Sequence, residues 1–114
     1  MLEGLGGNLE NYMTMLAARE KVVSSNIANA DTPGYKTQDV DFSSVLDDAL
    51  SGAAPRIVQP AGLRVKNDGN NVDLDREARL LAENALRFNV ASNLIRSQIR
   101  NVHTALQDGA SQSS

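Results

Sequence analysis

The chain has 114 residues, of which 4% are aromatic, and its formal net charge is −3 at pH 7. Its 11 lysine and arginine residues are scattered, which excludes the clustered basic surface that nucleic-acid binding needs. Cysteine is absent, which excludes disulfides, thiolate catalysis and zinc–cysteine sites. We expect a single domain over residues 1–114, with a thin core.

An amphipathic helix is predicted over residues 8–30. Its apolar positions recur in steps of three, four and seven residues, which places them on one side of a helix. They are Leu9, Tyr12, Met13, Leu16, Val23, Ile27 and Ala30. Asn8 is the expected N-cap, and the helix should end near Ala30 because Pro33 disfavours helical geometry just before it.

The middle of the chain, residues 31–71, contains all three prolines and little periodicity. Two weak strand-like runs occur there, at Arg56–Gln59 and Leu63–Lys66. A stretch this poor in pattern predicts an irregular loop or a short hairpin rather than a second domain.

The strongest periodic signal belongs to a C-terminal helix predicted over residues 72–108, ended by Gly109 and followed by a frayed tail over 109–114. Apolar residues alternate in steps of four and three along it, interrupted only by Ser92. We call this stripe the seam; its members are Leu74, Ala78, Leu81, Ala85, Phe88, Ile95, Ile99, Val102 and Leu106. The repeat predicts a mainly α protein whose two long terminal helices pack as a coiled-coil-like pair.

Two hypotheses account for the apolar stripes. In the first, they cover each other in an intramolecular hairpin. In the second, other chains cover part of them, since the C-terminal stripe is longer and Leu80, Leu86, Val90 and Leu94 lie off the seam. A helix that is apolar on more than one side needs more than one neighbour, which favours assembly. The free monomer is then expected to be partly disordered.

No residue pattern predicts catalysis or a cofactor. The acidic stretch Asp68–Asp75 fails the calcium-loop spacing, because Asp73 stands where glycine is required. It is interpreted as a turn that leads into a helix N-cap. His103 is the single histidine and has no second ligand near it in sequence, so no metal site is expected. The chain is predicted not to be an enzyme.

Asparagines are frequent in the predicted helices, although asparagine is a poor helix former. They are Asn26, Asn29, Asn84, Asn89 and Asn93. Either they are solvated or lie at a fraying helix end, or their amides hydrogen-bond between neighbouring helices and fix the register.

The contiguous stretch Ser24–Lys36 resembles the N-terminal signature of the flagellar rod and hook axial proteins. We call it the signature; its characteristic residues are Ser25, Asn26, Ile27, Ala28, Asn29, Asp31, Thr32, Pro33, Gly34, Tyr35 and Lys36. Pro33 and Gly34 suit the central positions of a type II turn. Two further stretches resemble the proximal-rod members of that family: Asp39–Phe42, and Gly69–Glu77 continuing into Ala82–Phe88.

This resemblance implies a structural subunit of the flagellar basal-body proximal rod, assembled through its terminal helices into a tubular drive shaft needed for motility. The implied partners are copies of itself, other rod proteins, the rod–ring adaptor, the basal-body ring and the flagellar type III export gate. The implied location is periplasmic. No apolar stretch approaches the roughly 18 residues of a membrane span, and no cleavable signal peptide is recognised. The alternatives are another rod protein of the same family and a free-standing regulatory helical hairpin.

Phe42 and Leu46 resemble the short element by which rod and hook subunits dock on the export gate. An aromatic and an apolar residue four apart share one face if the segment is helical, and together they can fill a small groove. The alternative is that both side chains pack the loop against the helices.

Overall fold

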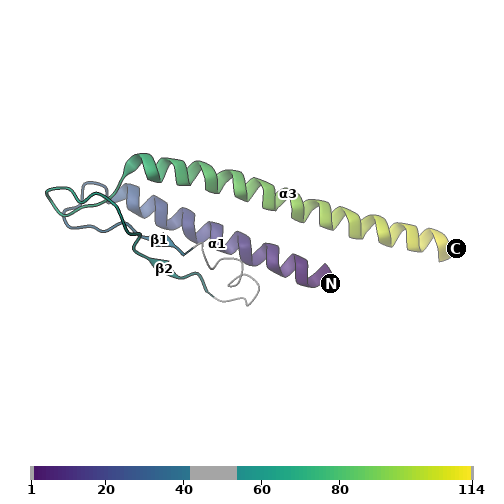
Figure 1. Cartoon of the computed structure of the whole chain (residues 1–114). Helices are drawn as coiled ribbons and strands as arrows, with labels where there is room; N and C mark the ends of the chain where they lie inside the picture. The colour runs from purple at the N-terminus through teal and green to yellow at the C-terminus, as the bar shows by residue number, and fades with distance from the viewer. Residues whose placement is uncertain (1, 42–53, 114) are drawn as a thin grey trace.

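The computed structural model of the chain describes residues 2–41 and 54–113. Within them, the helices α1 (Leu2–Ala28) and α3 (Leu74–Ser113) lie side by side and antiparallel (Figure 1). The molecule is elongated, with extents of 74 × 24 × 17 Å and a radius of gyration of 19.2 Å. A compact domain of this length would have a radius of gyration of about 13 Å. The predicted mainly α fold with two long terminal helices is confirmed.

Both helices are longer than predicted. α1 begins at Leu2, before the expected N-cap Asn8, and α3 continues through Gly109 to Ser113, into the tail predicted to fray. A glycine inside a helix costs only about 1 kcal/mol relative to alanine, so glycine alone does not end either helix. The other end of α1 lies at Ala28, close to the predicted end at Ala30, because Pro33 follows.

A two-stranded antiparallel sheet occupies the middle of the chain. β1 (Asp39–Val40) pairs with β2 (Ile57–Val58), so that Asp39 lies opposite Val58 and Val40 opposite Ile57. The predicted strand-like run Arg56–Gln59 therefore contains β2. The run Leu63–Lys66 is not a strand, and β1 was not predicted, because a two-residue strand leaves no readable alternation.

The core lies between α1 and its two neighbours. Met15, Val22 and Val40 form a buried cluster against β1, with Tyr12 and Ala18 packed at its edge. Leu16 and Val23 are also buried, as predicted, whereas Ile27 is exposed. The stripe on α1 is therefore broader than predicted, because both β1 and α3 cover this helix.

Neither α1 nor α3 combines the length and the apolar character that a membrane-crossing helix would need, as far as the described residues extend.

Candidate functional site

The signature forms a type II turn after α1. Gly34 has a φ of 75°, and the Tyr35 backbone N–H donates to the Thr32 carbonyl at 3.2 Å, closing the turn. Glycine adopts this left-handed conformation without the steric cost that other residues incur. The predicted turn with Pro33 and Gly34 at its centre is confirmed.

The turn is held by Asn70, a fully buried residue from the stretch that leads into α3. Its side-chain amide donates to the carbonyls of Asn29 at 2.8 Å and Thr32 at 2.9 Å. Its side-chain oxygen accepts from the Val72 backbone N–H at 2.8 Å. Each of these carbonyls also accepts a hydrogen bond from a backbone N–H of the turn, so the Asn70 amide occupies the second acceptor position of both. The two stretches that resemble the axial family therefore bind each other.

Gly34 and Gly69 mark the point where these two stretches cross. Gly69 also has a positive φ, of 86°, and a Cβ built on it would lie 3.3 Å from the Gly34 Cα. The Gly34 N–H donates to the Asp68 carbonyl at 2.8 Å, and the Lys36 ammonium donates to the Gly69 carbonyl. The crossing thus depends on the small size of one glycine as well as on the backbone conformation of both.

Asn26 connects the end of α1 to both other elements. Its side chain is fully buried, and its amide donates to the Gln38 carbonyl at 2.7 Å and to Glu77 Oε2 at 3.0 Å. Its oxygen accepts from the Gln38 N–H and the Tyr35 hydroxyl, both at 3.0 Å. All four hydrogen-bonding positions of the amide are used. Asn26 therefore fixes how the signature, β1 and α3 meet.

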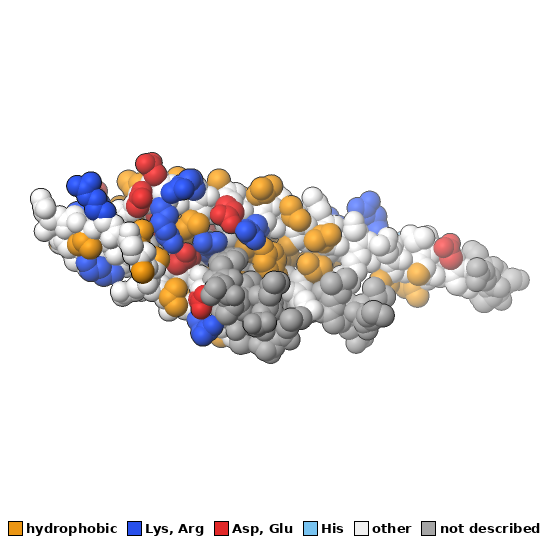
Figure 2. Space-filling view, in the orientation of Figure 1, with side chains coloured by type: hydrophobic (Ala, Val, Ile, Leu, Met, Phe, Trp, Pro, Cys, Tyr) orange, Lys and Arg blue, Asp and Glu red, His pale blue; other side chains and the backbone are white. Residues whose placement is uncertain are grey.

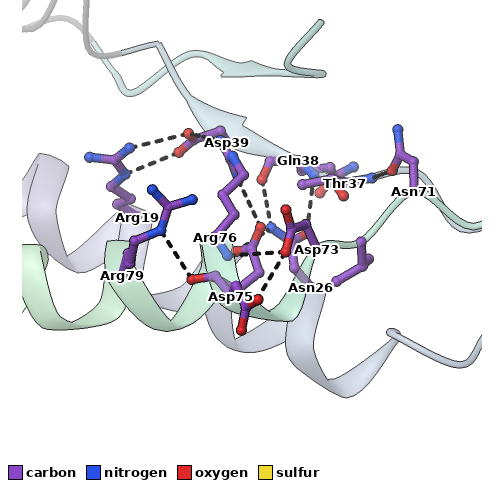
Figure 3. A network of polar contacts seen from close by, with 12 residues as sticks. Arg19, Asn26, Thr37, Gln38, Asp39, Asn71, Asp73, Asp75, Arg76 and Arg79 are labelled. Atoms are coloured by element: carbon purple, nitrogen blue, oxygen red, sulfur yellow. Dashed lines mark hydrogen bonds and ion pairs between the residues drawn. The ribbon is translucent and has the colours of Figure 1, made fainter. Parts of the chain in front are cut away.

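Four charged side chains continue this network (Figure 3). Arg19 from α1 contacts Asp39 Oδ1 at 3.2 Å, and Arg76 from α3 contacts Asp39 Oδ2 at 2.8 Å. Arg76 also contacts Glu77 Oε1 at 2.7 Å. The charges are two positive and two negative, and all four side chains are largely buried, so each carboxylate is paired. We call Arg19, Asn26, Asp39, Arg76 and Glu77 the polar anchor.

Sequence reasoning did not identify the polar anchor as a unit. Asp39, Arg76 and Glu77 stood in stretches matched to the axial family, but nothing indicated that they meet. One signal was available: Arg19 lies between Leu16 and Val23 on the buried side of α1, where an arginine requires a partner.

The remaining asparagines divide between the two hypotheses. Asn84 is 2% exposed, and its amide donates to the Leu16 carbonyl of α1 at 2.9 Å. The Asn29 amide folds back onto the Ser25 carbonyl at 2.9 Å, at the end of its own helix. Asn89 and Asn93 are exposed. Asn26 and Asn84 therefore connect elements within the chain, whereas the Asn29 amide stays on its own helix and Asn89 and Asn93 are open to solvent.

The seam does not face α1. The side of α3 that packs on α1 carries Glu77, Asn84 and Ala91, each seven residues after the last and each buried. These positions stand directly before Ala78, Ala85 and Ser92, so the seam is rotated to the adjacent side of the helix. Apart from the half-buried Ile95, its members are exposed, and Ile99 and Leu106 reach 64% and 69%.

The signature also presents an outer surface. Ser25, Ile27, Ala28 and the turn from Asp31 to Gly34 are exposed, while Tyr35 and Lys36 are half-buried. Within the described residues, no group of three or more acidic or histidine side chains is placed to hold a metal ion. Phe42 and Leu46 lie outside the described residues.

Further along α3, Arg87 connects the two helices at the surface. Its guanidinium donates to the Tyr12 hydroxyl at 3.1 Å and to Glu83 Oε1 at 2.9 Å. These hydrogen bonds, that to Tyr12 first, raise the pKa of Arg87 above its usual value, so the side chain stays charged. The contact orders the helix pair at a position where few side chains are buried.

Comparison with known proteins identifies the chain. The model of a family described as flagella basal body rod protein matches residues 13–36. The flagellar basal body rod protein FlgB of Yersinia enterocolitica is 35% identical over 137 residues, covering 96% of this chain and 100% of that protein. FlgB of Escherichia coli strain K12 is 32% identical over 125 residues, with 88% and 91% covered, and FlgB of Bacillus subtilis is 29% identical over 126 residues, with 96% and 98% covered.

These relatives confirm the resemblance that the signature suggested. They match most of the chain rather than the signature alone, and they carry the name of one rod protein. That family is a structural component of the flagellar basal body, not a class of enzymes. The chain therefore belongs to the FlgB family of flagellar basal body rod proteins.

Proposed function

We propose that this protein is a subunit of the proximal rod and that its terminal helices assemble into the tube that acts as the drive shaft. One observation carries the proposal. α3 turns a row of polar and small residues toward α1 and leaves its apolar seam exposed. A chain that functioned alone would be expected to bury its longest apolar stripe in its own core.

The energetics favour assembly over an isolated hairpin. Burying one leucine or isoleucine side chain contributes about 1.5–3 kcal/mol. Several seam residues are exposed in the single chain, so most of this free energy would be gained only when another chain covers them. A second exposed set, Leu86, Val90 and Leu94, lies on another side of α3. Apolar surface on two sides supports neighbours on two sides, as a tube wall requires. A free-standing regulatory hairpin would gain nothing from these residues.

The partners follow from the family and from the exposed surfaces. We propose contacts with copies of the same chain, with other rod proteins, and with the rod–ring adaptor and the basal-body ring. The protein would reach the periplasm through the flagellar type III export gate without a cleaved signal, and its role would be structural rather than catalytic. The long terminal helices and the exposed outer surface of the signature support these contacts.

Export provides a separate proposal. Phe42 and Leu46 would dock on the gate while the chain is unfolded. Changing both to alanine in a strain blocked in rod assembly should trap the protein in the cytoplasm, measured by cell fractionation. Normal periplasmic amounts would show that the two residues serve packing instead.

Deleting the gene tests the main proposal. We expect non-motile cells whose purified basal bodies lack an assembled rod, and we expect restoration by a plasmid copy. Normal flagella in the deletion strain would contradict a role in the rod.

A further inference from the structure

The seam divides into two parts with different surroundings. Its first part, from Leu74 to Phe88, runs beside α1. Its last part lies in residues 96–109, and the C-terminal end of α3 extends beyond the N-terminal end of α1 (Figure 1). We call residues 96–109 the overhang; all are exposed except the half-buried Gln98. Ile99, Val102 and Leu106 form the seam of the overhang and are exposed.

The first part of the seam borders a groove of about 410 Å³ between α3 and α1. We call it the seam groove; it is lined by Glu20, Leu81, Asn84, Ala85, Phe88 and Asn89. Ala85 is the smallest of these side chains and lies between Leu81 and Phe88 along the seam. The space above it suits a larger apolar side chain from outside. Hydrophobic side chains occur along the whole visible face of the molecule, not in a single patch (Figure 2).

The polar edge of the seam groove offers one accessible acceptor. Glu20 contributes an exposed carboxylate from α1. The Asn84 amide is used on the Leu16 carbonyl, and its oxygen Oδ1 is buried within the chain, so Glu20 is the acceptor that an incoming helix can reach. A helix that enters this groove would therefore gain most from a cationic donor beside its apolar residues.

The overhang carries this combination. Arg96 and His103 are seven residues apart and follow directly after Ile95 and Val102, so they flank the seam on one side. The corresponding positions of the first part are Ala82 and Asn89. The first part therefore has the small Ala82 where the overhang has the long, cationic Arg96. Arg96 is complementary in charge to Glu20 at the edge of the seam groove, and Ile99 is complementary in shape to the space above Ala85.

We infer that the overhang of one copy of this chain docks in the seam groove of a second copy, parallel to it and displaced by two heptads. This inference rests on the proposed function. A displacement of 14 residues, about 21 Å along a helix, places Ile99 over Ala85 and Arg96 beside Glu20. Pairing without displacement would instead place Ile99 against Ile99 and Ala85 against Ala85, which leaves the space above Ala85 unfilled.

This contact differs in kind from a symmetric dimer. The two surfaces are different, so each copy still has a free overhang at one end and a free groove at the other. Contacts of this type do not close after two copies, and they produce rings or helical filaments. Repetition of the displaced contact would therefore produce an open-ended assembly.

Cysteine cross-linking tests the inference, because the natural chain has no cysteine. Full-length Ala85→Cys and Ile99→Cys variants are expressed together in a strain lacking the natural gene, and basal bodies are oxidised and analysed on gels. We expect disulfides between the two variants and none between like variants, whose sulfurs would lie about 21 Å apart, too far for a disulfide. Ser97→Cys, exposed on another side of α3, replaces Ile99→Cys as the matched control and should not cross-link to Ala85→Cys.

A chain carrying both Ala85→Cys and Ile99→Cys separates the two topologies. A ladder extending beyond the dimer supports the displaced contact, whereas products that stop at the dimer overturn it. Cross-links between like variants, or none at all in rods that contain the protein, also overturn it. Absence of the natural protein from rods purified from the parent strain would count against the proposed function instead. Purified full-length chains, oxidised at high concentration, supply the same readout if a variant fails to enter rods.

Charge reversal gives an independent measurement. Glu20→Arg and Arg96→Glu should each weaken self-association in sedimentation experiments by roughly two- to five-fold, as expected for one partly exposed ion pair. The double variant should recover most of the loss. Additive weakening in the double variant would contradict the pairing.

Discussion

The two ends of α3 are stabilised in different ways. Its beginning is held inside the chain by the polar anchor, where Arg76 and Glu77 are paired and Asn26 uses every hydrogen-bonding position. Its end is an exposed helix with apolar residues on its surface and no covering element among the described residues. Hydrogen bonds and ion pairs, which are directional, thus fix the geometry at the beginning of α3. The apolar surface at its end is non-directional and remains available to partners.

The largest effect should come from the exposed end. Ile99→Asp should leave the thermal unfolding of the free chain within about 0.5 kcal/mol of the natural protein, since the side chain lies in solvent. In the rod the same carboxylate would enter an apolar contact without a partner, so assembly should fail and cells should be non-motile. Circular dichroism and motility assays check the two halves of this prediction. Ser97→Asp is the control, and motile Ile99→Asp cells would show that the seam is not buried in the rod.

The polar anchor should show the opposite behaviour. Asp39→Asn keeps the shape but removes the carboxylate that Arg19 and Arg76 share, and breaking a buried pair costs roughly 3–5 kcal/mol. Urea unfolding of the purified chain measures the loss. Asp41→Asn removes a more exposed pair with Arg56 just beyond the same strand and should cost about 1 kcal/mol or less. Equal losses for the two variants would mean that the polar anchor contributes no more than a surface ion pair.

Substitutions where the signature crosses Gly69 should lower the free energy of unfolding by an intermediate amount. Gly34→Ala should cost about 1–2 kcal/mol, because its positive φ strains any other residue while the space around it is open. Gly69→Ala should cost more, since its Cβ would also press on the Gly34 backbone. Unfolding experiments on both variants, made side by side, separate strain from crowding. A smaller loss for Gly69→Ala would mean that the backbones separate without cost.

The smallest effect is expected at the surface contact of Arg87. Glu83→Gln should lower the free energy of unfolding by about 0.2–1 kcal/mol, since both side chains are nearly half exposed. The difference should shrink as salt is added. Because the pKa of Arg87 is raised, loss of its charge would weaken the contact only at strongly alkaline pH, and the difference should be constant near neutrality. A large, salt-independent loss would indicate that this contact is buried.

The sequence was sufficient for the helices, the type II turn and the family, and insufficient for which side of α3 faces α1. Heptad spacing locates an apolar stripe but does not say whether the same chain or another covers it. The side that packs inside the chain is marked by Glu77 and Asn84, which composition alone assigns to solvent. Their burial depends on partners distant in sequence: Glu77 lies 51 residues from Asn26, and Asn84 lies 68 residues from Leu16.

The prediction that the free monomer is partly disordered remains to be tested, and the same contrast refines it. Hydrogen exchange should protect the beginning of α3 more than residues 96–109, because the former includes the buried side chains of Glu77 and Asn84 and the latter consists of exposed residues apart from the half-buried Gln98. Uniform protection along α3 would contradict this.

The short strand pair has a consequence for how such chains can vary in length. Pairing of β1 with β2, extended by the bond from the Asp41 N–H to the Arg56 carbonyl at 3.0 Å, brings residues 41 and 56 next to each other. A segment inserted between them would begin and end at neighbouring positions. Lengthening that segment would therefore add little to the entropic cost of closing the loop. The strand pair is therefore a junction at which the size of a subunit can change while its helices keep their positions.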